Sequence, residues 1–179
     1  ITGRAGFIGT VLKQHFLEQG AECVSIDLEP DSFLHPRFTA YQGDINDDNL
    51  MEKIFSVHKP EAVFHCAALL AHVKKDLKRL WHANVDGTRN VYDFALKYGV
   101  KKIVFISSNC LWAKNFDSPV QEDEATNPVE IYGKSKLEGD KILLSQPDKI
   151  NSIIFRSPTI MDEGRLGLLG ILFEFIDEG

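Results

Sequence analysis

The chain has 179 residues, of which 44% are hydrophobic, and its 26 acidic and 20 basic side chains give a net charge of -6. Since the sequence contains no stripe of Lys and Arg residues that could follow a phosphate backbone, we expect neither nucleic acid nor an anionic membrane surface as a partner. The longest apolar run, residues 167–176, is interrupted by Glu174 and is shorter than the roughly 20 residues that span a bilayer. We therefore expect a soluble globular protein.

Short apolar runs alternate with amphipathic segments along the chain. The apolar runs predict a first strand that ends at Thr2 and further strands over residues 22–27, 38–42, 61–66, 102–107 and 152–156. The amphipathic segments predict helices over residues 7–19, 48–58, 77–98, 132–145 and 166–176. Most strand runs do not alternate polar with apolar residues, as expected when helices cover both faces of a parallel sheet. The pattern predicts a doubly wound α/β fold.

Three glycines separated by two residues each, Gly3, Gly6 and Gly9, lie between the first predicted strand and the first predicted helix. Backbone N–H groups and the positive end of the helix converge there, so the pattern predicts a phosphate site. A plain tight turn explains a glycine triplet alone equally well. Asp27 favours the phosphate site, because it ends the next strand 18 residues after Gly9, near the offset at which an acid meets an adenosine ribose.

Asp27 also affects whether the site is expected to bind NAD or NADP. The carboxylate of Asp27 can accept hydrogen bonds from both ribose hydroxyls and would repel a 2′-phosphate, so we expect NAD rather than NADP. Arg4, inside the glycine loop, keeps NADP open as an alternative, since a guanidinium near the ribose could bind a phosphate.

Tyr132 and Lys136 are four residues apart on a predicted helix and share one face. We expect the ammonium of Lys136 to lower the pKa of Tyr132 from about 10 toward the range of a general base. Ser108 follows a predicted strand at its carboxyl end, where its hydroxyl can hold a substrate oxygen. The alternatives are an exposed Tyr–Lys pair on a helix surface and a serine that only forms a turn.

The stretch Thr2–Gly9, TGRAGFIG, resembles the opening motif of the extended short-chain dehydrogenase/reductases, the NAD-dependent epimerase/dehydratase family. Other pieces similar to this family follow in order: GDI at residues 43–45, HCAA at 65–68, NVDGT at 84–88, SS at 107–108 and YGKSK at 132–136. The resemblance implies a Rossmann-type NAD-binding domain over residues 1–160. It also implies that residues 161–179 begin a carboxyl-terminal substrate domain that is largely missing.

The resemblance further implies the residues of the site. Ser108, Tyr132 and Lys136 would be catalytic, Asp44 and Ile45 would flank the adenine, and Ala67 and Ala68 would leave room beside the cofactor. The full implied set of cofactor-binding residues is Gly3, Gly6, Phe7, Ile8, Gly9, Asp27, Asp44, Ile45, Ala67, Ala68, Tyr132 and Lys136. The chain departs from the family pattern in two places, with Leu111-Trp112-Ala113 in place of Val-Tyr-Gly and Asn109-Cys110 in place of the Asp-Glu pair of dehydratases.

Three further residues have more than one interpretation. His65, within a predicted strand, is expected to be a hydrogen-bonded core histidine rather than a catalyst. Asn84 either supports the backbone of the active site or caps a helix. Cys110 is expected to be a small apolar filler rather than a group that faces the site.

For function, the resemblance implies a nucleotide-sugar substrate and an NAD-dependent epimerisation through a keto intermediate. The alternatives are an NAD(P)-dependent sugar dehydrogenase or reductase and a non-catalytic NAD(P)-binding redox sensor. The family also implies a homodimer formed through the helices at residues 77–98 and 132–145. The six histidines have no metal-ligand spacing, and the three cysteines form no CxxC pair, so we expect no metal site and a cytoplasmic protein with reduced thiols.

Overall fold

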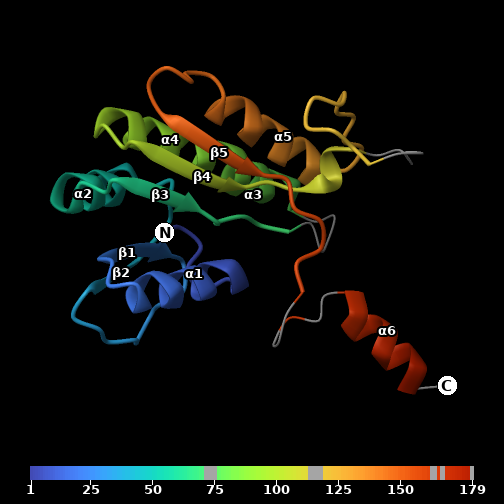
Figure 1. Ribbon diagram of the computed structural model, residues 1–179, viewed down its shortest axis with the longest axis horizontal. Helices are drawn as coiled ribbons and strands as arrows, with labels where there is room; N and C mark the ends of the chain where they lie inside the picture. The colour runs from blue at the N-terminus through green and yellow to red at the C-terminus, as the bar shows by residue number, and fades with distance from the viewer. Residues whose placement is uncertain (71–75, 113–118, 162–164, 166–167, 178–179) are drawn as a thin grey trace.

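The computed structural model describes residues 1–70, 76–112, 119–161, 165 and 168–177. Thr2 joins two groups of parallel strands into one sheet, because it forms parallel bridges to Ile26 and His65. The spatial order is β2, β1, Thr2, β3, β4 and β5 (Figure 1), which is the 3-2-1-4-5-6 order of dinucleotide-binding folds when Thr2 counts as the first strand. The strands are β1 (Cys23–Asp27), β2 (Phe38–Gln42), β3 (Ala62–His65), β4 (Lys102–Ile106) and β5 (Asn151–Phe155).

Helices cover both faces of this sheet. Right-handed crossovers place α1 on one face and α2, α4 and α5 on the other, in agreement with the contacts of α4 with both α2 and α5. Helix α6 lies apart from the sheet (Figure 1). Among the described residues, every helix is too short or too polar to cross a bilayer. The helices are α1 (Phe7–Glu18), α2 (Asp48–His58), α3 (Leu77–Trp81), α4 (Gly87–Lys97), α5 (Ile131–Leu143) and α6 (Leu168–Asp177).

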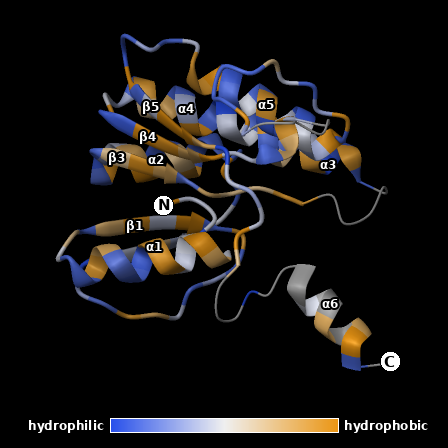
Figure 2. Cartoon of the chain, turned by 45° about the vertical axis from the view of Figure 1, so that its right-hand side comes forward, coloured by the Kyte–Doolittle hydropathy of each residue, from blue (hydrophilic) through white to orange (hydrophobic). Residues whose placement is uncertain are grey.

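The core lies between the sheet and the helices α2, α4 and α5. Ile103 and Phe105 alternate along β4, and both belong to one buried cluster with residues of these helices. The helices contribute buried positions at helical spacing, such as Val91 and Ala95 of α4. Figure 2 shows the resulting mixture of hydrophobic and hydrophilic residues along each covering helix. This arrangement confirms the predicted doubly wound α/β class.

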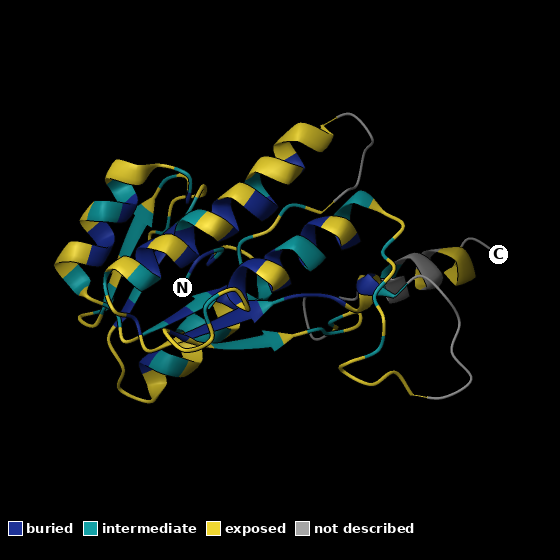
Figure 3. Ribbon diagram, turned by 90° about the horizontal axis from the view of Figure 1, so that it is seen from above, coloured by how far each residue is buried: buried dark blue, intermediate teal, exposed yellow. Residues whose placement is uncertain are grey.

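Most predicted bounds are close to the observed ones, and the helix predicted over residues 77–98 is observed as one continuous helical segment over residues 77–97 that contains an irregular turn. A π-helical turn, His82–Asp86, separates α3 from α4 within one long helical segment (Figure 3). The hydroxyl of Thr88, in the first turn of α4, donates to the carbonyl oxygen of Asn84 in the π turn at 2.6 Å. The amino end of the last predicted helix, residues 166 and 167, lies outside the described residues.

The end of the first strand packs tightly against the chain that follows β3. Thr2 N donates to Phe64 O at 2.9 Å, and Cys66 N donates to Thr2 O at 3.1 Å. Gly3 follows with a φ of 69°, and a Cβ atom there would lie 2.5 Å from the amide nitrogen of Ala67. Position 3 therefore requires glycine for two reasons, the positive φ and the close approach of two backbones.

Replacing Gly3 with alanine should cost more stability than replacing Gly99, although the two glycines have nearly equal φ values of 69° and 68°. The positive φ costs alanine about 1 kcal/mol at either position. Only at Gly3 does the new methyl group meet backbone atoms, whereas nothing lies within 4 Å at Gly99. We expect the free energy of unfolding to fall by about 1 kcal/mol in Gly99→Ala and by about 3 kcal/mol or more in Gly3→Ala. Urea unfolding measures both, and equal losses would contradict the close packing.

Candidate functional site

The three glycines of the loop meet different requirements. A Cβ atom on Gly9 would collide with the carbonyl oxygen of Gly3 and lie 2.7 Å from Cα of Arg4, so Gly9 lets α1 pack closely on the loop. A Cβ atom on Gly6 would meet only Gly3 O, at 3.3 Å. The fold thus requires Gly3 and Gly9 but comes close to tolerating a side chain at Gly6. Close approach of a ligand explains the glycine at position 6.

The amino end of α1 differs from that of α2 in how its N–H groups are satisfied. The carboxylate of Asp47 caps α2 by accepting hydrogen bonds from Asn49 N and Leu50 N. Helix α1 begins after Gly6, and no side chain among the described residues caps it, nor is there an acidic residue in its first turn. Its first N–H groups, at Phe7 to Gly9, are therefore suited to bind an anion.

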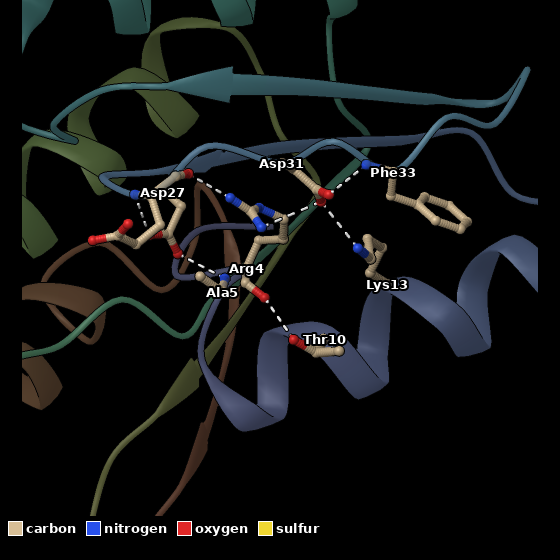
Figure 4. A network of polar contacts seen from close by, with 8 residues as sticks. Arg4, Ala5, Thr10, Lys13, Asp27, Asp31 and Phe33 are labelled. Carbon is tan, nitrogen blue, oxygen red and sulfur yellow. Dashed lines mark hydrogen bonds and ion pairs between the residues drawn. The ribbon is translucent and has the colours of Figure 1, made fainter.

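Asp27 lies beside this loop, as predicted. It ends β1, and its Oδ2 accepts a hydrogen bond from Ala5 N at 2.8 Å while its Oδ1 accepts one from Glu29 N at 3.0 Å (Figure 4). The carboxylate therefore joins the glycine loop to the chain that follows β1. Each carboxylate oxygen can accept a further hydrogen bond, which leaves capacity for ribose hydroxyls.

Arg4, the residue that kept NADP open, has a buried side chain bound to other groups of the chain. Its Nη2 donates to Glu29 O, and its Nη1 lies 3.3 Å from Oδ2 of Asp31. The ammonium of Lys13 binds the same Asp31 oxygen at 2.9 Å (Figure 4). Sequence reasoning missed both Lys13 and Asp31, because nothing in their spacing marks them as partners of a loop residue.

The residues predicted around the adenine and beside the cofactor have different environments. Asp44 follows β2 and is exposed, whereas Ile45 is a core residue whose side chain faces Gly87. Ala67 N donates to the hydroxyl of Thr2 at 3.2 Å, next to the glycine loop, and Ala68 is exposed. Of the pair predicted to flank the adenine, only Asp44 exposes its side chain, and both assignments stay predictions.

Helix α5, which carries Tyr132, packs directly on the short 3-10 helix Asn109–Leu111 that follows Ser108 and β4. A Cβ atom on Gly133 would collide with the carbonyl oxygen of Cys110, so glycine permits this contact. Ser108 is buried, and its Oγ accepts a hydrogen bond from Cys110 N at 3.2 Å. Cys110 itself is exposed, so the expectation of an apolar filler is wrong: the residue lies on an outward turn of the short helix.

Lys136 lies one turn after Tyr132 on α5 and is only 3% exposed. Its Nζ donates to Ile106 O at 2.9 Å and lies 4.7 Å from the ring centroid of Phe105 and 5.8 Å from that of Tyr132. Burial lowers the pKa of Lys136 to about 8, although the charge of Asp140 acts in the opposite direction. The arrangement puts a buried positive charge beside the predicted base.

The expected lowering of the Tyr132 pKa is wrong for the chain alone. Burial raises the pKa of Tyr132 above its ordinary value, and the Cys110 thiol adds to this effect, while Arg165 opposes it. The ammonium of Lys136 is bonded to the Ile106 carbonyl, so burial of the phenol dominates. Tyr132 is therefore held in its protonated form.

Asn84 and His65 are buried and make hydrogen bonds to residues around the candidate site. Asn84 is buried in the π turn, and its amide accepts from Leu69 N at 2.7 Å and donates to Leu69 O and Ser135 Oγ, each at 3.0 Å. Ser135 in turn donates to Tyr132 O at 2.7 Å, so Asn84 supports the backbone rather than capping a helix. His65 is buried with both ring nitrogens hydrogen-bonded, as expected, and burial lowers its pKa to about 3.

A cavity of about 600 Å³ lies elsewhere, between β1 and β3 near their amino ends. Among the described residues that line it, none belongs to the predicted site. Since ligands of open α/β sheets bind at the carboxyl ends of the strands, the cavity is not the candidate site.

The buried ammonium of Lys136 should make stability depend on alkaline pH. The pKa of this lysine is about 8 in the fold against 10.5 in the unfolded chain, so between these values the unfolded chain binds the extra proton. The free energy of unfolding then rises with pH, and we expect a rise of about 3 kcal/mol over that range relative to Lys136→Met. Urea unfolding at several pH values measures the difference. The exposed Lys149→Met is the matched control, and a pH-independent difference for Lys136→Met would contradict the prediction.

Known proteins resemble the chain at the level of sequence. A model of the NAD dependent epimerase/dehydratase family matches residues 1–164. A UDP-glucose 4-epimerase of Halalkalibacterium halodurans is 34% identical over 146 residues, which cover 79% of this chain and 44% of the relative. An uncharacterized protein of Sinorhizobium fredii is 34% identical over 182 residues, which cover 100% of this chain and 45% of the relative. The chain spans less than half the length of these curated relatives.

Solved structures resemble the fold. The Bordetella bronchiseptica enzyme WbmH, solved in complex with NAD+, has a TM-score of 0.87 and 28% identity and covers 99% of this chain and 62% of its own. The UDP-glucose 4-epimerase of Thermotoga maritima, solved with UDP-glucose, has a TM-score of 0.80 and 29% identity. This match covers 97% of the present chain and 60% of the epimerase chain. Since the family model matches residues 1–164, the chain belongs to the NAD dependent epimerase/dehydratase family.

Proposed function

We propose that the protein is an NAD-dependent epimerase that acts on a nucleotide sugar by transient hydride transfer through a keto intermediate. The observation that supports the proposal is the packing of α5, which carries Tyr132 and Lys136, on the short helix that follows Ser108 and β4. The UDP-glucose 4-epimerases of Halalkalibacterium halodurans and Thermotoga maritima, similar to this chain, support the substrate class.

The residues of the loop fit NAD, the cofactor of the family. The uncapped amino end of α1 and the bare backbone at Gly6 would hold the pyrophosphate, and Asp27 would hold the adenosine ribose. Lys136 would bind the hydroxyls of the nicotinamide ribose. When bound, NAD supplies a nicotinamide ring that accepts a hydride and can give it back.

In this reaction the side chains of the protein transfer a proton and position the substrate. Once ionised to the phenolate, Tyr132 would take the proton of a sugar hydroxyl while the hydride leaves the carbon that bears it, so the carbon becomes a ketone. Ser108 holds the ketone oxygen. After the sugar turns over, Tyr132 returns the proton as the hydride returns to the opposite face of the carbon. The configuration is inverted, and no net oxidation or reduction takes place.

The forward step requires Tyr132 as the phenolate, and the return step requires it as the phenol. Burial keeps Tyr132 protonated in the chain alone, which favours the phenol. Ionisation of the phenol, which must come before it accepts a proton, needs nearby positive charge. Lys136, with a pKa of about 8, carries that charge at neutral pH, and its Nζ lies 5.8 Å from the ring centroid of Tyr132.

The deciding experiment incubates the whole protein, as it is encoded, with NAD and a panel of UDP-sugars. Sugar products are followed by NMR and the nicotinamide by absorbance. A changed sugar without net NADH supports epimerisation. Stoichiometric NADH formation would indicate a dehydrogenase instead of an epimerase. Tight NAD binding with no change in any sugar of the panel would favour the non-catalytic module. The expected homodimer stays a prediction, measured by light scattering of the same preparation.

Replacing Tyr132 with phenylalanine removes the proton-transfer group while leaving the buried ring in place. We expect turnover to fall by about 10²-fold or more. Affinity for NADH, measured by fluorescence, should change by less than about threefold. Tyr98→Phe, at the carboxyl end of α4, is the matched control and should keep its turnover. An active Tyr132→Phe protein would remove the assignment of the base.

Replacing Gly6 with alanine should separate cofactor binding from folding. The new methyl group meets only the Gly3 carbonyl, at 3.3 Å, so we expect the free energy of unfolding to change by about 1 kcal/mol or less. The same methyl group lies where the pyrophosphate must approach, so we expect NADH affinity to fall by about tenfold or more. Fluorescence titration and urea unfolding measure the two quantities. Unchanged NADH affinity would show that the pyrophosphate does not approach Gly6.

A further inference from the structure

We infer that Asp31 is a specificity-determining residue that occupies Arg4 and Lys13 and so keeps both cations from binding the 2′-phosphate of NADP. The three side chains form a compact group between the glycine loop, α1 and the chain that follows β1 (Figure 4). The inference concerns the choice between two nucleotides. It rests on NAD binding by this family and not on the proposed sugar chemistry.

The geometry holds Arg4 away from solvent. Its side chain is 7% exposed and that of Asp31 8%, and their charged groups lie 3.3 Å apart. A second bond ties the guanidinium to the carbonyl oxygen of Glu29. Arg4 therefore has two partners on the chain that follows β1 and is not a free surface cation.

Lys13 binds the same carboxylate from the second turn of α1. Its Nζ lies 2.9 Å from Oδ2 of Asp31 and is also 4.7 Å from the ring centroid of Phe33. The other oxygen of Asp31, Oδ1, accepts a hydrogen bond from Phe33 N at 2.8 Å. One carboxylate thus holds two cations and is itself held in place by the backbone.

This group adjoins the place where Asp27 would meet the ribose. Glu29 N donates to Oδ1 of Asp27, and Glu29 O accepts from the guanidinium of Arg4. The acid expected to hold the ribose hydroxyls and the arginine therefore contact the same residue from its two sides. A phosphate on the 2′-hydroxyl would lie next to Arg4, and the pairing with Asp31 would keep the guanidinium from binding it.

The charges favour NAD for this reason. Burial alone would raise the pKa of Asp31, but the hydrogen bonds from Phe33 N and Lys13 and the charges of Arg4 and Lys13 lower it below its ordinary value. Asp31 is thus ionised at neutral pH and offsets one of the two positive charges, and Asp27 offsets the other. A doubly charged phosphate would enter a region with no net positive charge to receive it.

The test measures the affinities of the whole protein for NADH and NADPH by fluorescence, without any sugar. In Asp31→Asn, which keeps the shape and can still accept from Phe33 N, we expect the ratio of the NADPH and NADH dissociation constants to fall by about tenfold or more. Adding Arg4→Gln to this variant should restore most of the discrimination. Asp148→Asn removes an exposed carboxylate elsewhere and should leave the ratio unchanged.

Two further variants keep the inference falsifiable if Asp31→Asn folds poorly. Asp31→Glu retains the charge and should discriminate as the unsubstituted protein does. Arg4→Gln alone should change NADPH affinity by less than about threefold, because Asp31 already occupies the guanidinium. An unchanged ratio in a folded Asp31→Asn protein, or a tenfold loss of NADPH affinity in Arg4→Gln alone, would overturn the inference. Failure of the epimerase assay would leave these binding results unaffected.

Discussion

The contact between the backbones of Gly3 and Ala67 fixes how closely two strand ends approach each other. Because this contact leaves no room for a Cβ atom, the loop that starts at Gly3 must turn at once toward α1, and Gly9 then allows the helix to pack on the loop. The amino end of α1 and the carboxylate of Asp27 are brought to the same edge of the sheet as a result. The geometry of the nucleotide site follows from this one tight approach.

A second close approach positions the residues that we propose to be catalytic. Gly133 lets α5 lie on the turn after β4, and Asn84 connects the same helix, through Ser135, to the chain after β3. The positions of Tyr132 and Lys136 therefore depend on backbone contacts and a buried amide, not on the two side chains themselves. Such support from packed elements is what holds catalytic groups at a defined distance.

The sequence predicted the fold class and most elements, and it indicated the residues of the candidate site, because glycine spacing, hydrophobic period and the Tyr–Lys spacing are local properties. It did not predict the π turn or the hydrogen bonds that Asn84, within this turn, makes to distant Leu69 and Ser135. It also missed the pairing of Arg4 with Asp31 and the raised pKa of Tyr132, since both arise from side chains brought together or buried only by folding. Local pattern reveals which groups are present, whereas their partners and electrostatics come from tertiary packing.

The π turn at His82–Asp86 also limits how the chain can change length. A helix advances by about 100° per residue, so deleting one residue there would restore a regular helix and rotate α3 by that angle relative to α4. Asn84 and the residues before it could not all keep their present neighbours after such a rotation. The extra residue thus fixes the rotation of α3 relative to α4 about the helix axis. We expect insertions and deletions in this stretch to be tolerated only when they preserve that rotation.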